Sequence, residues 1–193
     1  MKYVIKFREH FSKASVFTTN DAKLFLSSLG ASEQYAHLFL NQMLKKGEIN
    51  RIKKGTYTFG TDPMLAGFAY RPSYHGLQDA LSILDLWDQE TNTILITPLK
   101  VRTGAHEILG GTVIIRRINR KMFFGFEMVK YFDYWIAVTD VEKTLIDFIY
   151  FKEPLQAGVL EEIKKRIDRK KLDEYLGRCS PRVRKRVRSA LNR

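Results

Sequence analysis

Residues 18–59, TTNDAKLFLSSLGASEQYAHLFLNQMLKKGEINRIKKGTYTF, decide the fold of the N-terminal part of the chain. The stretch opens with side chains that can cap a helix, Thr18-Thr19-Asn20-Asp21, and apolar residues follow at helical spacing as far as Leu29. Gly30 then ends the helix, because glycine readily takes the left-handed conformation that follows a last helical turn. The stretch therefore begins with a short amphipathic helix.

A second helix is predicted directly after the first, over about 33–46. Ser32 can cap it, and Glu33 in its first turn interacts favourably with the helix dipole. Apolar residues recur at i, i+3, i+4, i+7 and i+8, a spacing that predicts one buried face: Ala36, Phe39, Leu40, Met43 and Leu44. Gly47 ends this helix.

A β-hairpin is predicted next. The β-prone runs 49–52 and 56–59 flank the turn Lys53-Lys54-Gly55. Two short helices joined by a tight turn and followed by a hairpin, with these loop lengths, predict a winged helix-turn-helix. A further short helix is expected over 3–11.

The sequence Gly60-Thr61-Asp62-Pro63 breaks the pattern and predicts a domain boundary, with a winged helix-turn-helix over 1–60 and a second domain over 61–193. The second domain is predicted to group its strands before most of its helices, which makes the chain α+β, ending in basic helices. Its expected strands are 93–97, 112–118, 122–129 and 134–138, and its expected helices are 77–87, 139–151, 155–176 and 181–191.

The formal net charge of +12 is concentrated at the two ends of the 193-residue chain. Residues 1–60 hold ten Lys or Arg and four Asp or Glu, and residues 161–193 hold thirteen and five. The middle of the chain, with ten and twelve, is slightly acidic. Two basic ends are typical of a protein that binds a polyanion such as DNA, although surfaces rich in Lys and Arg also occur without such a partner.

Several classes of protein are disfavoured. No apolar run reaches the roughly 20 residues that a membrane helix needs, and the N-terminus lacks the apolar stretch and cleavage site of a signal peptide. A single cysteine, Cys179, excludes a disulfide framework within the chain. We expect a cytoplasmic protein with no membrane partner and no cofactor.

The outward side of the helix over 33–46 is the first candidate binding surface. Asn and Gln can pair with base edges, and Lys can reach phosphate or guanine. A recognition helix reads bases mainly with its N-terminal residues, which favours Ser32, Gln34 and Tyr35. The other outward residues are Leu38, Asn41, Gln42 and Lys45. The alternative is an ordinary solvated helix face.

Two basic segments are further candidates. Arg51, Lys53 and Lys54 lie at or beside the hairpin turn, where cations can meet the phosphate backbone. The second segment, near the C-terminus, has three open interpretations: solvation alone, a second DNA contact, or a dock for an acidic partner. Its members are Arg182, Arg184, Lys185, Arg186 and Arg188.

Signals of an enzyme are weak. None of the four histidines is paired with a carboxylate or another histidine at metal-binding spacing. A metal-dependent nuclease would need Asp147, Glu162 and Lys164 to converge, but the helical periodicity around Glu162 favours a surface helix. Thr139 to Glu142 is interpreted as a capping box that starts a helix. We therefore expect no catalytic residue and no metal.

Three segments resemble the AbiEi family of antitoxins and transcriptional regulators of toxin–antitoxin pairs. The first is Leu44-Lys45-Lys46-Gly47-Glu48-Ile49-Asn50-Arg51-Ile52-Lys53-Lys54-Gly55-Thr56-Tyr57, within a wider likeness over 17–59. The second is Tyr70-Arg71-Pro72-Ser73-Tyr74-His75-Gly76-Leu77-Gln78-Asp79-Ala80-Leu81. The third and most distinctive is Val138-Thr139-Asp140-Val141-Glu142-Lys143-Thr144-Leu145-Ile146-Asp147.

The resemblance implies a DNA-binding autorepressor that acts as the antitoxin of a type IV pair. The DNA would be its own promoter, with inverted repeats, and the functional partner would be a nucleotidyltransferase-like toxin. DNA contact is then expected at Thr19, Ser32, Gln34, Tyr35, Asn41, Lys45, Lys53, Lys54 and Thr56. The alternatives are a winged-helix-targeted nuclease and a protein-interaction module without DNA binding.

Overall fold

The structure, a computed structural model, describes residues 3–192 and has the predicted α+β class. The chain divides into two compact units. The first comprises the residues up to Arg71 together with His106–Val113, and the second comprises Pro72–Ala105 and the residues from Ile114 onward. The division thus follows Arg71, whereas the sequence places it between residues 60 and 61.

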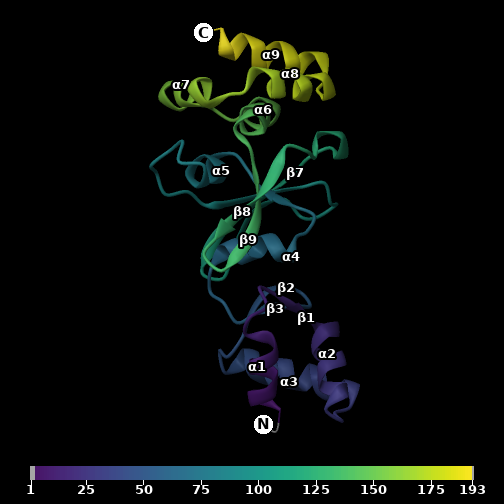
Figure 1. Cartoon of the computed structure of the whole chain (residues 1–193). Helices are drawn as coiled ribbons and strands as arrows, with labels where there is room; N and C mark the ends of the chain where they lie inside the picture. Colours follow the sequence, from purple (N-terminus) through teal and green to yellow (C-terminus); the bar gives the residue numbers. More distant parts are fainter. Residues whose placement is uncertain (1–2, 193) are drawn as a thin grey trace. The chain divides into compact units, whose positions relative to one another are not determined.

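Three helices and a three-stranded antiparallel sheet make up most of the first unit (Figure 1). The helices are α1 (Val4–Phe11), α2 (Thr19–Ser28) and α3 (Glu33–Lys45). The sheet has the order β1-β3-β2, formed by β1 (Phe17–Thr18), β2 (Asn50–Lys53) and β3 (Thr56–Thr58). A 3-10 turn, η1 (Pro63–Leu65), and the short α4 (Ala66–Ala69) follow.

Capping residues fix the ends of α2 and α3. The side chains of Thr18 and Asp21 each accept a hydrogen bond from the other residue's backbone N–H, at 3.2 and 2.7 Å, which forms a capping box. Gly30, with a φ of +84°, turns the chain after α2. The Ser32 hydroxyl accepts from the backbone N–H of Tyr35 and starts α3. The turn between the two helices is therefore set by local chemistry that the sequence displays.

Aromatic rings dominate the core of the first unit. Phe7 of α1 is fully buried, and its ring lies 4.7 to 5.4 Å from those of Phe11, Phe17 and Phe39. Tilted and edge-to-face pairs at these separations add to the apolar area that folding buries. The core ties α1 to α3 and to β1, so the outward face of α3 rests on a rigid base.

The second unit contains most of a six-stranded sheet of order β6-β7-β5-β4-β9-β8. Its strands are β4 (Tyr74–His75), β5 (Thr93–Thr97), β6 (Gly104–Ile108), β7 (Gly111–Arg117), β8 (Phe126–Tyr131) and β9 (Tyr134–Thr139). The sequence did not predict β4 or β6. The strand expected from residue 122 begins only at Phe126, because a 3-10 turn, η2 (Arg120–Met122), precedes it and is capped by the Asn119 side chain.

Five helices complete the second unit: α5 (Gln78–Ile83), α6 (Val141–Phe151), α7 (Ala157–Arg166), α8 (Arg169–Arg178) and α9 (Pro181–Leu191). The buried α6 packs against α7, α8 and α9, which lie together above it in Figure 1. The helix expected over 155–176 is in fact two helices, because Asp168 starts a new one by accepting from the backbone N–H groups of Lys170 and Lys171. Within residues 3–192, none of the helices has the length and apolar character of a membrane span.

Candidate nucleic-acid interface

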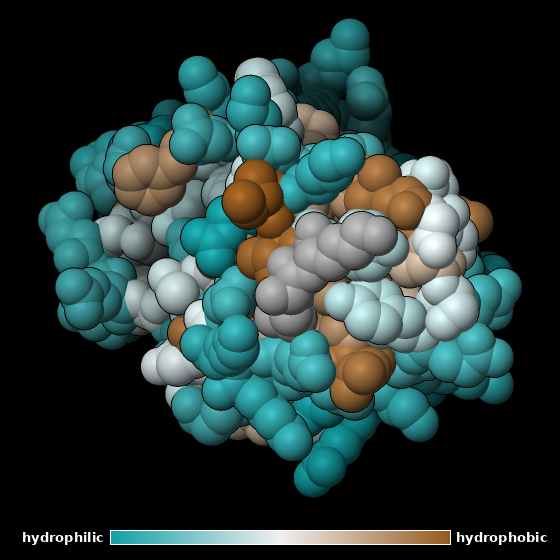
Figure 2. Space-filling model, turned by 90° about the horizontal axis from the view of Figure 1, so that it is seen from below, coloured by the Kyte–Doolittle hydropathy of each residue, from teal (hydrophilic) through white to brown (hydrophobic). Residues whose placement is uncertain are grey.

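Helix α3 presents a polar face opposite its buried one. Ala36, Phe39, Leu40 and Met43 are at most 1% exposed, as predicted, whereas Leu44, the fifth predicted member of the core face, is only half-buried. The opposite side carries five exposed side chains: Gln34, His37, Leu38, Asn41 and Lys45. Figure 2 looks onto the first unit, where hydrophilic side chains predominate and apolar ones show between them. The exposed large apolar side chains of this unit are Ile5, Leu24 and Leu38.

The N-terminal residues of α3 divide into two kinds. Gln34 is exposed, as a base-reading residue must be. Tyr35 is half-buried because its ring packs edge-to-face on Tyr3 and lies 5.9 Å from Phe39. The Ser32 hydroxyl serves as the helix cap. Of the three residues expected to contact bases, Gln34 is therefore the one whose side chain neither packs in the core nor caps the helix.

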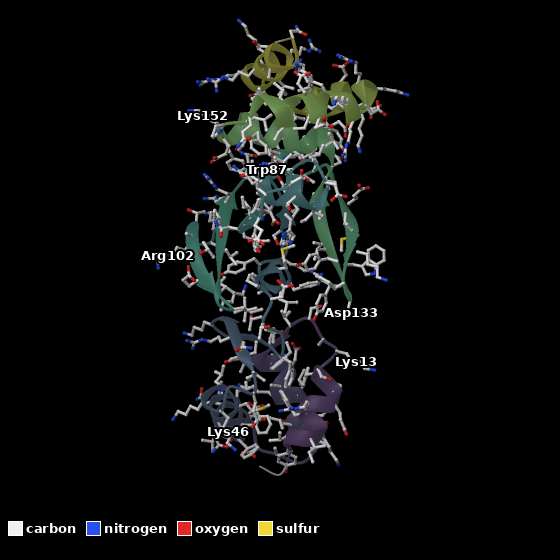
Figure 3. All side chains as sticks on the ribbon, turned by 90° about the vertical axis from the view of Figure 1, so that its left-hand side faces the viewer. Lys13, Lys46, Trp87, Arg102, Asp133 and Lys152 are labelled. Carbon is white, nitrogen blue, oxygen red and sulfur yellow. The ribbon has the colours of Figure 1, made fainter. Side chains whose placement is uncertain are left out.

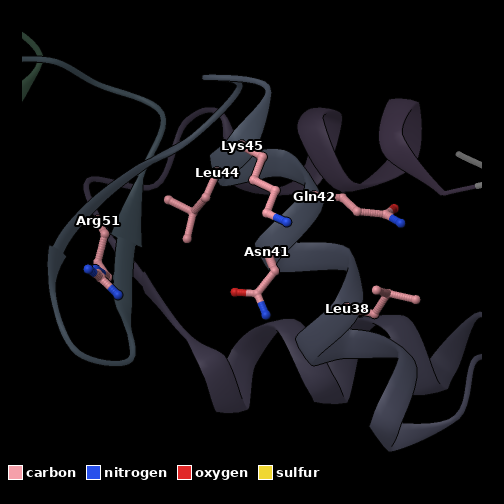
Figure 4. A pocket seen from close by; sticks show the side chains of 6 residues that line it. All are labelled: Leu38, Asn41, Gln42, Leu44, Lys45 and Arg51. Atoms are coloured by element: carbon pink, nitrogen blue, oxygen red, sulfur yellow. The ribbon is translucent and has the colours of Figure 1, made fainter.

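A depression of about 660 Å³ lies between α3 and β2. Its lining combines apolar and polar side chains: Leu38, Asn41, Gln42, Leu44, Lys45 and Arg51. Figure 4 shows Arg51 projecting from the hairpin strand while the Asn41 and Lys45 side chains leave the neighbouring turns of α3. Arg51 and Lys45 supply positive charge, and the Asn41 amide offers a donor and an acceptor side by side. The depression thus joins the polar face of α3 to the hairpin.

Two acidic side chains of the first unit have partners, while Glu33 in the first turn of α3 is exposed. Glu48 pairs with Arg8 at 3.3 Å, and Asp21 belongs to the capping box of α2. The cations Lys45, Lys46 and Lys54, by contrast, are exposed. The surface formed by α3 and the hairpin is therefore positive, which favours a polyanionic ligand.

The two hairpin lysines differ in a way that the sequence does not reveal. Lys54 is exposed on the turn beside Gly55, whose φ is +76°. The Lys53 ammonium instead donates a hydrogen bond to the backbone oxygen of Ala69 and lies 4.8 Å from the centre of the Tyr70 ring. The Lys53 side chain thus points back onto the segment after the hairpin, and the expected phosphate contact would require this hydrogen bond to break.

Two threonines that the family resemblance implicated have other roles. Thr56 is 6% exposed, since it pairs in β3 with Thr18 on one side and with Lys53 on the other. This burial disfavours the expected contact between the Thr56 side chain and DNA. Thr19 is half-buried, and its backbone N–H donates to the oxygen of Gly55 at 3.0 Å. This bond fixes the start of α2 against the hairpin turn.

The C-terminal basic segment is divided between structural and exposed side chains. Arg184 donates from Nε to the oxygen of Leu176 and from Nη2 to that of Cys179, at 3.1 and 3.3 Å, so it caps the end of α8. Arg188 pairs with Asp173 at 3.3 Å. Arg182, Lys185 and Arg186 are exposed. Arg184 is therefore a structural residue, Arg188 is ion-paired, and Arg182, Lys185 and Arg186 form an exposed basic surface on α9.

The segment from Thr139 to Asp147 forms a buried polar network that the sequence analysis treated only as a helix start. Lys143 and Asp147 are fully buried and form an ion pair, and the Tyr74 hydroxyl donates to Asp147 at 2.9 Å. Burial lowers the pKa of Lys143 and raises the pKa of Asp147, and in each case the partner's charge opposes the shift. A Lys and an Asp four residues apart inside a helix as apolar as 141–151 were the signal that could have revealed the pair.

The start of α6 also differs from the predicted capping box. The cap is Asp140, which accepts from the backbone N–H of Lys143 at 2.8 Å, rather than Thr139. The carboxylate of Glu142 turns away to accept from the backbone N–H of Asp168 at 2.7 Å. Asp140 also accepts from the Tyr175 hydroxyl at 2.7 Å, and burial together with this bond raises the pKa of Tyr175 to about 12. The whole network is satisfied internally, as expected for a structural element.

The three residues that the nuclease alternative requires have separate partners. Asp147 is buried against Lys143, whereas Glu162 lies on the surface of α7 and pairs with Lys165 at 2.6 Å. Lys164 pairs with Glu161. In the described part of the chain no three His, Cys, Asp or Glu side chains form a group that could hold a metal ion.

His75 is paired with a carboxylate, which the sequence did not predict. Its Nδ1 lies 2.7 Å from the carboxylate of Asp79 in the first turn of α5, and both residues are buried. Asp79 also accepts from the backbone N–H of Ile94, so the pair joins α5 to β5. The spacing i, i+4 was visible in the sequence, but the short strand that carries His75 was not.

The first unit thus offers a solvent-facing helix flanked by a positive hairpin, while the polar network of the second unit is turned inward. Neither the models of known protein families nor the curated proteins include a match to this chain.

Proposed function

We propose that the first unit is a winged helix-turn-helix that binds duplex DNA. In this arrangement α3 enters the major groove, and the β2–β3 hairpin meets the phosphate backbone beside it. The observation that carries the proposal is the continuous surface on which Gln34, Asn41 and Lys45 lead along α3 to Arg51, with Lys54 exposed at the next turn. An α-helix fits the major groove, where Asn and Gln amides can pair with adenine.

The roles within this surface follow from chemistry. Gln34 and Asn41 are the base-reading candidates, because amides carry a donor and an acceptor that match base edges. Lys45, Arg51 and Lys54 are the phosphate contacts, which supply affinity without sequence preference. Thr56 and Lys53 are left out, since one is buried and the other is occupied by Ala69.

The likeness of residues 138–147 to the AbiEi family extends the proposal to a biological role. The protein then represses its own promoter and acts as the antitoxin to a nucleotidyltransferase-like toxin. Within residues 138–147, Lys143 and Asp147 have a structural role, because their buried network holds α6 to β4 in the second unit. Rescue of growth when this chain is co-expressed with the toxin encoded beside it would support the role, and absence of rescue with a stably folded protein would oppose it.

Fluorescence anisotropy with a labelled duplex from the protein's own promoter tests DNA binding. We expect the affinity for this duplex to exceed that for a scrambled duplex, and to fall steeply between 50 and 200 mM salt, by roughly 0.9 in log–log slope for each phosphate contact. Asn41→Ala should reduce the preference for the promoter by roughly 5- to 150-fold, the loss of one bidentate base contact worth about 1–3 kcal/mol. Lys170→Ala, an exposed cation on α8, is the matched control.

Absence of binding to either duplex at low salt, by a protein that remains folded, would contradict the proposal. That outcome would favour a protein-interaction module that uses the same surface for another partner.

A further inference from the structure

A pocket of about 330 Å³ in the second unit has no role in the proposed DNA binding. Its floor is formed by Leu81 of α5 and Phe148 of α6, which are both 1% exposed, and Val159 of α7 closes one side. The indole of Trp87 and the chain around Leu155 form the remaining walls. The space is therefore built from three helices and two connecting segments of one unit.

The lining is apolar apart from two amides. Gln78 and Gln156 also line the pocket, and no Asp, Glu, Lys, Arg or His is among its lining residues. Small-molecule sites are typically concave spaces of about 300–1,000 Å³ with apolar and aromatic walls and a few polar groups that orient the ligand. This pocket has that composition, and its lack of charge selects an uncharged ligand.

The segments that shape the pocket contain residues with unusual backbone geometry. Leu77, which precedes Gln78, has a φ of +58°, and Asp85, two residues before Trp87, has a φ of +53°. Lys152, labelled with Trp87 in Figure 3, ends α6 with a φ of +58° just before Pro154. Residues other than glycine rarely adopt a positive φ. Such conformations persist where the surrounding structure fixes them. Three of the five such residues among 3–192 therefore adjoin the walls of this pocket.

Specific bonds hold these segments. Arg166 of α7 donates from its two terminal nitrogens to the backbone oxygens of Leu84 and Asp85, each at 2.8 Å, and so fastens the segment that leads to Trp87. The wall after α6 is fastened by Glu153, whose backbone N–H donates to the oxygen of Phe148 at 3.0 Å and whose carboxylate pairs with Arg116. The walls are thus preorganised, which lowers the entropic cost of binding.

We propose that this pocket binds a small, uncharged aromatic molecule. A single aromatic ring is small enough for a space of about 330 Å³ that Trp87 and Phe148 line, and offset or edge-to-face packing on their rings is favourable. A hydroxyl or carbonyl group on that ring can pair with the amide of Gln78 or Gln156, each of which offers both a donor and an acceptor. The assignment does not depend on DNA binding by the first unit.

The chain contains two tryptophans, and they make the test internally controlled. Trp87 lines the pocket, whereas Trp135 lies on β9 and is 56% exposed. In a ¹H–¹⁵N spectrum of the full chain, p-cresol should shift the indole signal of Trp87 in a saturable manner and leave that of Trp135 in place. Trp87→Phe assigns the two signals.

Matched probes define the ligand class. Benzoate, which has the same ring and a charge, and cyclohexanol, which has no aromatic ring, should each bind at least tenfold more weakly than p-cresol. N-acetyl-phenylalanine amide presents the ring on a peptide backbone. Tighter binding of that amide than of p-cresol would assign the pocket to a partner's side chain and overturn the proposal.

Two variants test the location. Leu155→Tyr places a ring at the half-buried wall and should abolish the p-cresol shift, while thermal unfolding shows that the variant is folded. Gln78→Ala should weaken p-cresol binding but leave toluene binding unchanged, because only the polar group is lost. Equal shifts at both tryptophans, equal binding of benzoate, or no shift up to millimolar p-cresol would each overturn the proposal.

Discussion

Lys143 and Asp147 lie one turn apart on α6 and form a fully buried ion pair, on which the Tyr74 hydroxyl closes by accepting from Lys143 and donating to Asp147. Burying two charges is costly, and the pair is stable only because each charge meets the other and a third polar group. The three residues link α6 to β4, at the centre of the second unit's core.

Replacing one member of this pair should be far more destabilising than replacing both members with apolar residues. Asp147→Leu leaves the Lys143 ammonium buried without a counter-charge, and we expect a loss of about 3–5 kcal/mol in the free energy of unfolding. The double variant Lys143→Met with Asp147→Leu should lose less than Asp147→Leu alone, as measured by urea unfolding. Asp173→Asn, which removes an exposed partner of Arg188, should change the free energy of unfolding by less than about 1 kcal/mol. Equal losses for the single and double variants would contradict this account of the network.

High pH should weaken the fold through Tyr175. Burial and the hydrogen bond to Asp140 raise the pKa of Tyr175 to about 12, above its usual value of 10.0. Because the folded state holds the phenol proton more tightly than the unfolded state, the stabilisation is fully present below pH 10 and is lost as the pH rises toward 12. The difference in unfolding free energy between the wild type and Tyr175→Phe should therefore shrink across this range. A difference that is constant from pH 9 to pH 12 would show that the hydrogen bond does not form.

The two hairpin lysines should behave differently on DNA. Lys54→Ala should reduce the salt dependence of DNA binding by about one unit of log–log slope, the effect of one lost phosphate contact. Lys53→Ala should leave the slope unchanged and lower the thermal stability of the first unit, because its ammonium bonds to Ala69. Anisotropy titrations at several salt concentrations measure the slope for both variants. Equal slope changes for the two would place both ammonium groups on the phosphates.

Loss of the cap on α3 gives a further prediction. Ser32→Ala removes the hydroxyl that accepts from the Tyr35 backbone, and should cost about 1 kcal/mol of unfolding free energy. Ser32→Asp keeps an acceptor at the cap and should restore most of this stability. If Ser32→Ala left stability unchanged but abolished DNA binding, Ser32 would be a direct contact rather than a cap.

Local patterns allowed much of the first unit to be predicted. The capping residues Thr18 and Ser32 and the buried face of α3 are short-range signals, and each appears where the sequence placed it. The inward direction of the Lys53 side chain was not predicted, because β2 is irregular between Arg51 and Lys53, where its register with β3 shifts. Such a bulge re-aims the next side chain, and it depends on pairing that a linear sequence does not show.

The second unit was harder to predict because its decisive contacts are long-range. The two-residue strand β4 exists only between β5 and β9, with which it pairs on either side. Lys143 would be placed on the surface by any composition rule, since lysine is rarely buried without a partner. Its partners include Tyr74, far away in the sequence. Strands near β8 and β9 were by contrast predicted, over 122–129 and 134–138, although their pairing as a hairpin, with Asp133 at its tip in Figure 3, was not.

Chemical-shift mapping of the full chain on its promoter duplex tests the central claim most directly. We predict that the largest backbone and side-chain shifts fall on Gln34, Asn41 and Lys45 of α3 and on Lys54 at the hairpin turn, while Thr56 and the buried Lys143 change little. Saturable binding of the duplex that leaves α3 and the hairpin unshifted would contradict the account.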